Sequence, residues 1–316
     1  MARYDIEVDW HINEYCNFGC IYCFDKDDKK KKSIGYDNTN NIVNGFRNSG
    51  LTWLIHMSGG EPLFFPNIIN LCETLSRDHL ISMNTNLSHN NIISFTEKVS
   101  SERVEFIHCS LHIQERERLG LVEDYIKKYN MLKKKGYYVF ASYVMFPELI
   151  DRFEKDYEYF KKEGIILMPK IFRGDYNIFK KSNEGIFRKI RHVFIKNYPK
   201  DYSEKQKVFL QNCINNSQLD MDLYNEKTPN VGEMRTIDLT HDIKFINGLP
   251  SFKGKLCLAG KKFARMTPDG DVFRCQDENL FLGNLFEEEV KLFEKPIPCS
   301  ANICSCPYHG MRYVIK

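Results

Sequence analysis

The sequence predicts an α/β fold, in which a partial (β/α)6 TIM-like barrel is followed by a small cysteine-rich module made of a hairpin and a helix. Three observations predict it. Segments typical of strands and of helices alternate over residues 4–174, polar side chains gather after the strands, and eight of the 11 cysteines fall into two groups near opposite ends of the chain. Six successive strand–helix units favour parallel strands joined by right-handed crossovers, and therefore an open or partly closed barrel.

The six units are recognised from short apolar blocks that alternate with longer amphipathic segments. Strands are expected at 4–13, 52–60, 79–86, 104–112, 137–146 and 165–174. Helices are expected at 38–50, 66–77, 90–100, 119–136 and 149–164. Gly50 is expected to end the first helix, and Pro66 to open the second.

Composition and charge exclude several classes of protein. The 316 residues carry a formal charge of +3, with 28% charged and 42% hydrophobic residues, which is too mild a basic excess to indicate a nucleic-acid partner. The N-terminal stretch has no apolar run typical of a signal peptide, and nowhere is an apolar run long enough to span a membrane. A cytoplasmic protein is therefore expected, and the basic run Lys29–Lys32 is interpreted as a solvated loop.

The first cysteine group indicates a metal or redox centre. An odd number of cysteines in a cytoplasmic chain does not fit a disulfide framework. Cys16, Cys20 and Cys23 follow the first strand within one short loop. Three thiolates leave one iron of a 4Fe-4S cluster without a protein ligand, whereas structural zinc requires four ligands. The isolated thiols are expected to be buried and structural: Cys72, Cys109 and Cys213.

Polar residues follow the other strands in the same way. The motif SGGEP at 58–62 follows the second strand, and Lys170 and Arg173 lie near the end of the sixth. By strand alternation Asn84 and Asn86 share one face of the third strand, and His108, Ser110 and His112 share one face of the fourth. Because active sites of such folds lie at the carboxyl ends of the strands, all of these groups are expected at one rim.

The cysteine spacing and SGGEP together identify a resemblance over residues 1–175. CNFGCIYC at 16–23, with Tyr22 at the aromatic position, resembles the C-x3-C-x-aromatic-C pattern of radical S-adenosylmethionine (radical SAM) enzymes. The resemblance implies that the three cysteines ligate a 4Fe-4S cluster whose open iron chelates S-adenosylmethionine. One electron would then cleave this cofactor to a deoxyadenosyl radical that abstracts a hydrogen atom from the substrate.

The same resemblance assigns the cofactor-binding residues. Gly59, Gly60 and Glu61 would receive the methionine amino group, with Glu61 supplying a carboxylate acceptor. Asn86 and Ser110 would contact the ribose, and Asn84 shares the strand face of Asn86.

The second cysteine group resembles a SPASM or twitch extension of radical SAM enzymes. Cys257 and Cys275 flank a hairpin with its turn at Asp269-Gly270, and residues 280–295 are expected to form a turn and a helix. Three thiols follow, of which Cys304 and Cys306 are slightly preferred over Cys299 as ligands. Five cysteines favour a single auxiliary 4Fe-4S cluster, and a zinc-stapled structural tail is the alternative.

Three regions are expected: a barrel at 1–175, a connecting segment at 176–250 that walls the substrate cavity, and the cysteine-rich module at 251–316. The connecting segment predicts two helices on either side of Pro199, with Ser203 opening the second, and a hairpin at 236–248.

The substrate hypothesis is oxidation or epimerisation of a small, sugar-like molecule. No additional winged-helix-like segment precedes the barrel, which weakly favours a small substrate over the alternative, a peptide-modifying maturase. The candidate bases are His108, His112, Lys170 and Arg173, and a flavodoxin or ferredoxin is the expected reductant. A remote alternative is a zinc-stapled binding protein without enzymatic activity, in which Lys29–Lys32 would contact an acidic partner.

Overall fold

The computed structural model describes residues 3–23, 38–172, 202–226, 243, 245–248, 250–287, 289–302, 304 and 313–315. Its centre is a nine-stranded sheet in the order β10-β9-β8-β1-β2-β3-β4-β5-β6. The six N-terminal strands are β1 (Ile6–Asn13), β2 (Trp53–Gly59), β3 (Leu80–Thr85), β4 (Val104–Ser110), β5 (Val139–Met145) and β6 (Leu167–Ile171). They pair in parallel and in chain order, as the sequence predicts. Among the described strands β10 and β6 are the edges, so the sheet is open.

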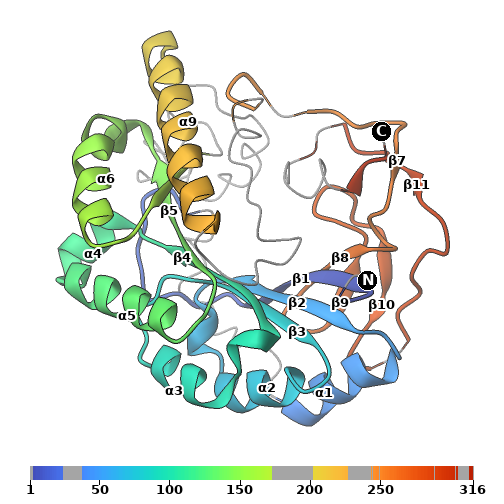
Figure 1. The fold of residues 1–316 in the computed structure, drawn as a ribbon. Coiled ribbons are helices and arrows are strands. Elements are labelled where there is room, and N and C mark those ends of the chain that lie inside the picture. The colour runs from blue at the N-terminus through green and yellow to red at the C-terminus, as the bar shows by residue number, and fades with distance from the viewer. Residues whose placement is uncertain are drawn as a thin grey trace, which may run out of the picture.

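Helices between the parallel strands cover the outer face of the curved sheet (Figure 1). They are α1 (Thr39–Asn48), α2 (Ile68–Leu75), α3 (Asn91–Lys98), α4 (Ile113–Leu119), α5 (Val122–Lys134) and α6 (Phe153–Lys162). Helix α1 ends before Gly50, whose positive φ of 66° suits the turn. Helix α2 begins two residues after Pro66, so the proline precedes the helix rather than opening it. Helix α4 was not predicted, because its polar residues 114–118, four of them charged, give no apolar periodicity.

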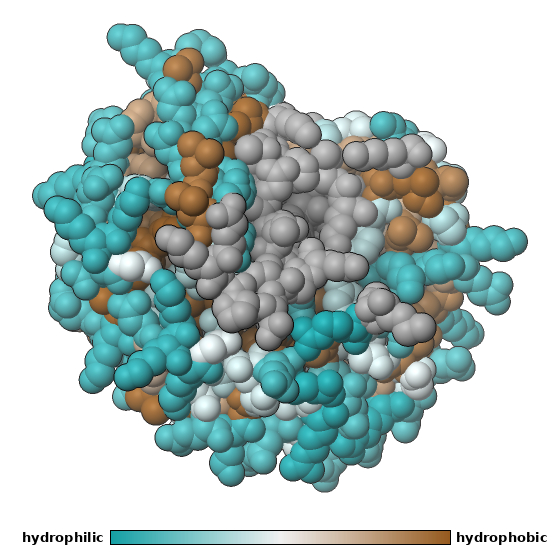
Figure 2. Space-filling view, viewed as in Figure 1, coloured by the Kyte–Doolittle hydropathy of each residue, from teal (hydrophilic) through white to brown (hydrophobic). Residues whose placement is uncertain are grey.

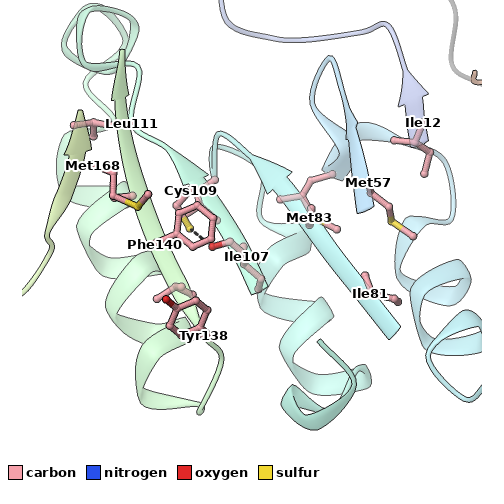
Figure 3. Close-up of a cluster of buried hydrophobic side chains, with 14 of the residues drawn as sticks. Ile12, Met57, Ile81, Met83, Ile107, Cys109, Leu111, Tyr138, Phe140 and Met168 are labelled. Carbon is pink, nitrogen blue, oxygen red and sulfur yellow. Dashed lines mark hydrogen bonds between the residues drawn. The ribbon is translucent and has the colours of Figure 1, made fainter. Parts of the chain in front are cut away.

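The core lies between the sheet and these helices, and strand alternation decides which residues enter it. On β1, Trp10 is fully buried and packs against Phe46 of α1, with ring centroids 6.0 Å apart. Figure 3 shows buried side chains along the neighbouring strands, with Cys109 among aliphatic and aromatic side chains. Cys72 and Cys213 are also buried, so the structural interpretation of the three isolated thiols agrees with their packing. The opposite face of the strands carries polar residues such as His108 and Ser142, together with the ring of Phe140.

The C-terminal part of the chain extends the same sheet. Strand β8 (Phe263–Met266) pairs in parallel with β1, and β9 (Asp271–Phe273) completes the predicted hairpin in antiparallel pairing with β8. The turn contains Gly270 with φ of 89°. The hairpin is therefore joined to the barrel sheet through β1. A second, small sheet pairs β7 (Leu256–Cys257) with β11 (Ile297–Pro298).

The helix expected at 280–295 is wrong. Residues Phe281–Asn284 form strand β10, antiparallel to β9, and a turn follows. Gly283 has a φ of 132°, which no right-handed helix accommodates. The Asn284 side chain donates to Asp269 O and Asp271 Oδ1, at 3.0 and 2.9 Å, and so fixes this strand against the hairpin turn.

Within the predicted connecting segment, the structure describes helix α9 (Glu204–Glu226). It begins after Ser203 as expected, and the Ser203 hydroxyl accepts a hydrogen bond from Gln206 N at 3.3 Å. Tyr157 and Lys161 of α6 both donate to Asp220 of α9. Apolar side chains are exposed along α9 among hydrophilic ones (Figure 2). No helix in the described ranges is long and apolar enough to cross a bilayer.

The remaining expectations for 176–250 fall largely outside the described residues. The helix expected before Pro199 lies there, as does most of the hairpin expected at 236–248. The described residues 245–247 form a turn, so no strand is present at that point.

Candidate functional site

A cavity of about 310 Å³ lies at the carboxyl ends of the parallel strands. The structure brings together in its lining almost the whole set of residues that the sequence singles out: Cys16, Cys20, Tyr22, Cys23, Gly59, Gly60, Glu61, Asn84, Asn86, His108, Ser110, His112 and Lys170. Arg173 and the run Lys29–Lys32 lie outside the described residues. The convergence follows from parallel pairing, because equivalent ends of β1 to β6 meet at one edge of the sheet.

The two glycines allow the SGGEP segment to lie directly against the chain that leads into the cysteine loop. Gly60 N donates to Asn13 O at 2.8 Å, and Glu61 N donates to Tyr15 O at 2.7 Å. A Cβ at Gly60 would lie 2.1 Å from Tyr15 O, and one at Gly59 would lie 2.3 Å from Asn13 O. Only glycine fits such contacts. In this structure the glycines therefore also position the cysteine loop.

Glu61 is a buried anchor for the next strand. Its Oε1 accepts hydrogen bonds from Thr85 Oγ1 at 2.6 Å and Leu63 N at 3.1 Å, and Oε2 accepts from Asn86 N at 2.6 Å. Burial raises the pKa of this carboxyl, while the bonds from Thr85, Asn86 and Leu63 oppose the shift. A carboxylate has about four lone-pair sites. Most of them are used within the chain, which argues against the amino group of S-adenosylmethionine as the main partner of this side chain.

The three thiols of the first group lie in one loop between β1 and the cavity. Cys16 Sγ accepts from Phe18 N at 3.4 Å and from Asn86 Nδ2 at 3.7 Å, and Cys23 N donates to Cys20 O at 3.1 Å. Burial, together with the proximity of Cys23 and Cys16, raises the pKa of Cys20 well above its usual range. Neighbouring thiols that would repel one another as thiolates fit a cationic metal centre, which would remove this repulsion.

The number of these thiols suits a cluster with one open iron better than a structural zinc ion. No three His, Cys, Asp or Glu side chains of the described part of the chain are placed to hold one metal ion together. In a 4Fe-4S cluster each thiolate binds a different iron, so the sulfur atoms stand further apart than around one zinc ion. The number of thiols, their chemical type and the adjoining cavity therefore all fit a 4Fe-4S cluster held by three cysteines.

Two residues that support the loop were missed from the sequence. Glu115 Oε2 accepts a hydrogen bond from Gly19 N at 2.7 Å, in the middle of the cysteine loop. Arg116 is fully buried: its Nε donates to Leu111 O at 2.6 Å, its Nη2 donates to Asn86 O, and its guanidinium lies 5.3 Å from the centre of the Phe18 ring. A run of alternating charges is typical of a solvated helix face, so the sequence carried no signal for these roles.

Tyr22 and His112 face each other across the cavity wall. The Tyr22 hydroxyl lies 3.0 Å from His112 Nδ1, and the two rings pack with centroids 5.8 Å apart. His112 has a left-handed backbone, with φ of 48°. Burial, aided by the nearby Arg116 charge, lowers the pKa of His112 to about 3. The imidazole is therefore neutral at neutral pH.

On the β4 to β6 side, polar groups form a second wall of the cavity. His108 Nε2 lies 2.7 Å from Ser142 Oγ, and the His108 ring stacks on Phe140 at 4.7 Å. Burial, and then the charge of Lys170, lower the pKa of His108 well below its usual range. Ser110 Oγ donates to Asn84 Oδ1 at 3.0 Å.

A second, smaller cavity of about 40 Å³ gathers thiols of the C-terminal group. Four cysteines line it: Cys257, Cys275, Cys299 and Cys304. Burial raises the pKa of Cys275 to about 11 and also raises the pKa of Cys299. Cys306 lies outside the described residues. The geometry thus places Cys299, the less preferred residue of the tail, beside the other three.

Comparisons with known proteins agree with this architecture. A family model described as the Radical SAM superfamily matches residues 10–160. A search of curated protein sequences finds no match.

Among solved structures, native anSMEcpe with bound AdoMet and Cp18Cys peptide is similar with a TM-score of 0.57 and 16% identity, over 90% of this chain and 78% of that chain. SuiB from Streptococcus suis, bound to S-adenosylmethionine, is similar with a TM-score of 0.55 and 14% identity, over 90% of this chain and 64% of that one. These likenesses concern the fold. Residues 10–160 therefore form a radical SAM domain, and the radical SAM superfamily uses a 4Fe-4S cluster and S-adenosylmethionine.

Proposed function

We propose that this enzyme holds a 4Fe-4S cluster on Cys16, Cys20 and Cys23 and binds S-adenosylmethionine in the adjoining cavity. The observation that carries the proposal is the single cavity lined by the three thiols, the glycine motif and the polar faces of β3 and β4. When bound, the cluster supplies one electron that cleaves S-adenosylmethionine to methionine and a deoxyadenosyl radical, which abstracts a hydrogen atom from the substrate.

The residues of the chain would orient the cofactor and exclude water. Backbone groups of Gly59 and Gly60 are proposed to receive the methionine amino group, with Glu61 holding this segment against β3. Asn86 and Ser110 are proposed to contact the ribose, with Asn84 fixing the Ser110 hydroxyl at 3.0 Å.

A second cluster is proposed at the C-terminal cavity. Cys257, Cys275, Cys299 and Cys304 together supply the four thiolates that a complete 4Fe-4S site requires. A cluster at this position would accept the electron that remains on the substrate after hydrogen abstraction, which suits a two-electron oxidation. A tail site built on zinc is the competing assignment.

The first substrate hypothesis remains a small, sugar-like molecule that is oxidised or epimerised. A peptide substrate is the second, because structures of the same fold were solved with peptides, among them SuiB bound to the precursor peptide SuiA, with a TM-score of 0.51. The reductant, the cytoplasmic location and the division of the chain at 175 and 250 stay predictions.

A base for the oxidation is proposed among the cavity residues. His112 and His108 are neutral at pH 7 because burial lowers their pKa values, and the same shift makes each imidazole a weaker base than a solvent-exposed histidine. Lys170 lines the same wall. We expect His112→Ala to retain iron and S-adenosylmethionine cleavage in the absence of substrate, but to lose product. Loss of iron in this variant would remove the catalytic role.

The experiment that tests the function is anaerobic incubation of reconstituted enzyme with reductant, S-adenosylmethionine and a panel of amino sugars and peptides. Formation of 5′-deoxyadenosine with loss of two hydrogen atoms from one substrate supports the oxidation. A product of unchanged mass that carries solvent deuterium indicates epimerisation instead. Purified protein that takes up zinc and no iron would contradict the enzyme assignment.

A further inference from the structure

Beside the C-terminal cavity lies a buried ion pair between Arg274 and Glu278. The side chain of Arg274 is 2% exposed and that of Glu278 is 6% exposed. Arg274 Nη1 donates to Glu278 Oε2. A buried ion pair is costly to desolvate, so its presence calls for a role beyond simple stability.

The arginine binds two separate chain segments that carry thiols. Its Nε donates to Ala259 O at 3.2 Å, two residues after Cys257. Its Nη1 donates to Pro298 O at 3.1 Å and its Nη2 to Ile297 O at 3.0 Å, directly before Cys299. The fixed fork of a guanidinium suits such simultaneous contacts, whereas a lysine provides a point charge.

The carboxylate completes the connection from the other side. Glu278 Oε1 accepts from Ser300 N and from Ala301 N, the latter at 3.1 Å, so it binds the chain directly after Cys299. Arg274 itself precedes Cys275, and its own N donates to Leu280 O at 2.9 Å. Three of the four thiols that line the cavity are thus adjacent, in the chain, to groups held by this one pair.

Apolar packing alone gives little support at this place. The hydrophobic cluster around the cavity contains only four buried residues among those described: Cys257, Ala259, Phe263 and Tyr313. A site whose ligands come from distant segments needs partners outside the ligand shell to fix their spacing.

We propose that Arg274 and Glu278 are positioning residues that hold Cys257, Cys275 and Cys299 at the spacing of the auxiliary cofactor before it binds. The proposal rests on the proposed second cluster at this cavity. The Glu278 carboxylate also lies beside one of the proposed ligands, since it accepts from the N–H groups of Ser300 and Ala301, which directly follow Cys299. A negative charge at this place disfavours addition of an electron, so Glu278 also lowers the reduction potential of a cluster bound there.

The test uses the full chain with Cys16, Cys20 and Cys23 replaced by alanine, reconstituted with iron and sulfide, so that only the C-terminal site can load. This parent is expected to bind about four irons.

In the same background, Arg274→Lys keeps the charge but removes the fork, and should lose iron to a chelator about 10–100-fold faster than the parent. Glu278→Gln should raise the midpoint potential of the cluster that remains. Lys261→Met is the control, because the Lys261 side chain donates to Glu294 O in an exposed hydrogen bond.

A variant with both Arg274→Met and Glu278→Leu distinguishes positioning from folding, because apolar replacement of a buried ion pair is often neutral for stability. We expect this double variant to keep the circular dichroism spectrum of the parent while losing iron as fast as Arg274→Lys. Iron retention and potential equal to the parent in all three variants would overturn the positioning role. A parent that binds no iron would instead refute the second cluster itself.

Discussion

The two cysteine regions are built in opposite ways. The loop with Cys16, Cys20 and Cys23 follows a central strand of a large sheet and is held by hydrogen bonds from SGGEP, Asn86 and Glu115. The C-terminal thiols come from segments around a small apolar cluster and are joined by one buried ion pair. We infer from this comparison that the first site is organised by the fold. The second site depends on the proposed auxiliary cluster and on the Arg274–Glu278 ion pair.

The largest effect is expected from a substitution at the closest backbone contact of the first cysteine region. In Gly60→Ala the new Cβ would meet Tyr15 O at 2.1 Å, so the cysteine loop must move. A displacement of about 1 Å can cost about 100-fold in rate, and we expect at least this loss in reductive cleavage of S-adenosylmethionine, measured as 5′-deoxyadenosine formed.

Gly164→Ala is the control, since nothing lies within 4 Å of its Cβ. Its positive φ should cost about 1 kcal/mol of stability while activity is retained. Equal activity of both variants would contradict the packing role.

The second-largest expected effect is a difference between the two regions in their amide exchange after iron is removed. Because the second site has little apolar support, chelation is expected to increase amide exchange in residues 250–302, while strands β3 to β5 keep their protection. Hydrogen–deuterium exchange of the holo and the chelated enzyme measures this difference. A uniform change over both regions would show that they do not differ in their dependence on the cofactor.

A smaller effect is expected from the Glu61 anchor. Glu61→Gln keeps the shape but turns an amide donor toward Thr85 or Asn86, both of which already donate to this position. The free energy of unfolding in urea should fall by about 1.5–3 kcal/mol. Glu73→Gln removes surface ion pairs with Arg77 at 3.8 Å and Lys98 at 3.9 Å, and should change this free energy by less than about 1 kcal/mol. A Glu61 variant as stable as that control would argue against the anchor.

The smallest expected effect concerns the aromatic position of the cysteine motif. Tyr22→Phe removes the hydroxyl that lies 3.0 Å from His112 Nδ1 and leaves the ring packing in place. Unfolding should become easier by about 1 kcal/mol, with iron content unchanged. Tyr159→Phe, which removes an exposed bond to Glu123 of 2.9 Å, serves as the comparison and should have no measurable effect. Loss of iron from Tyr22→Phe would show that the hydroxyl has a further role at the cluster.

The barrel could be predicted because each strand is a short apolar block that ends in polar residues. The same regularity predicted the lining of the main cavity, from Cys16 in the loop after β1 to Lys170 on β6. The pairing of β8 with β1 could not be predicted, because two strands about 250 residues apart in sequence share no local signal. The strand at 281–284 was mistaken for part of a helix because its spacing of apolar residues fits both periods, and only Gly283 pointed away from a helix.

Charged residues with structural roles were the hardest to predict. Glu115, Arg116 and Arg274 look like surface residues in the sequence. Glu115 and Arg274 nevertheless bind backbone groups in or next to a cysteine segment, and Arg116 binds the backbone carbonyl of Asn86. Their partners are brought close only by the tertiary fold, so composition and spacing contain no trace of them. The roles predicted for Glu61, Gly59 and Gly60 were incomplete for the same reason, because these residues contact the chain at or just after β1 and β3.

The most direct test of the account is the content of iron and acid-labile sulfide per chain after anaerobic reconstitution. It should be measured for the native chain, for the variant with Cys16, Cys20 and Cys23 changed to alanine, and for one with Cys257, Cys275, Cys299 and Cys304 changed to alanine. We expect about eight irons in the native chain and about four in each variant. A native chain with only about four irons, all lost when the first group is removed, would contradict the second cluster. Zinc without iron would contradict both iron–sulfur sites.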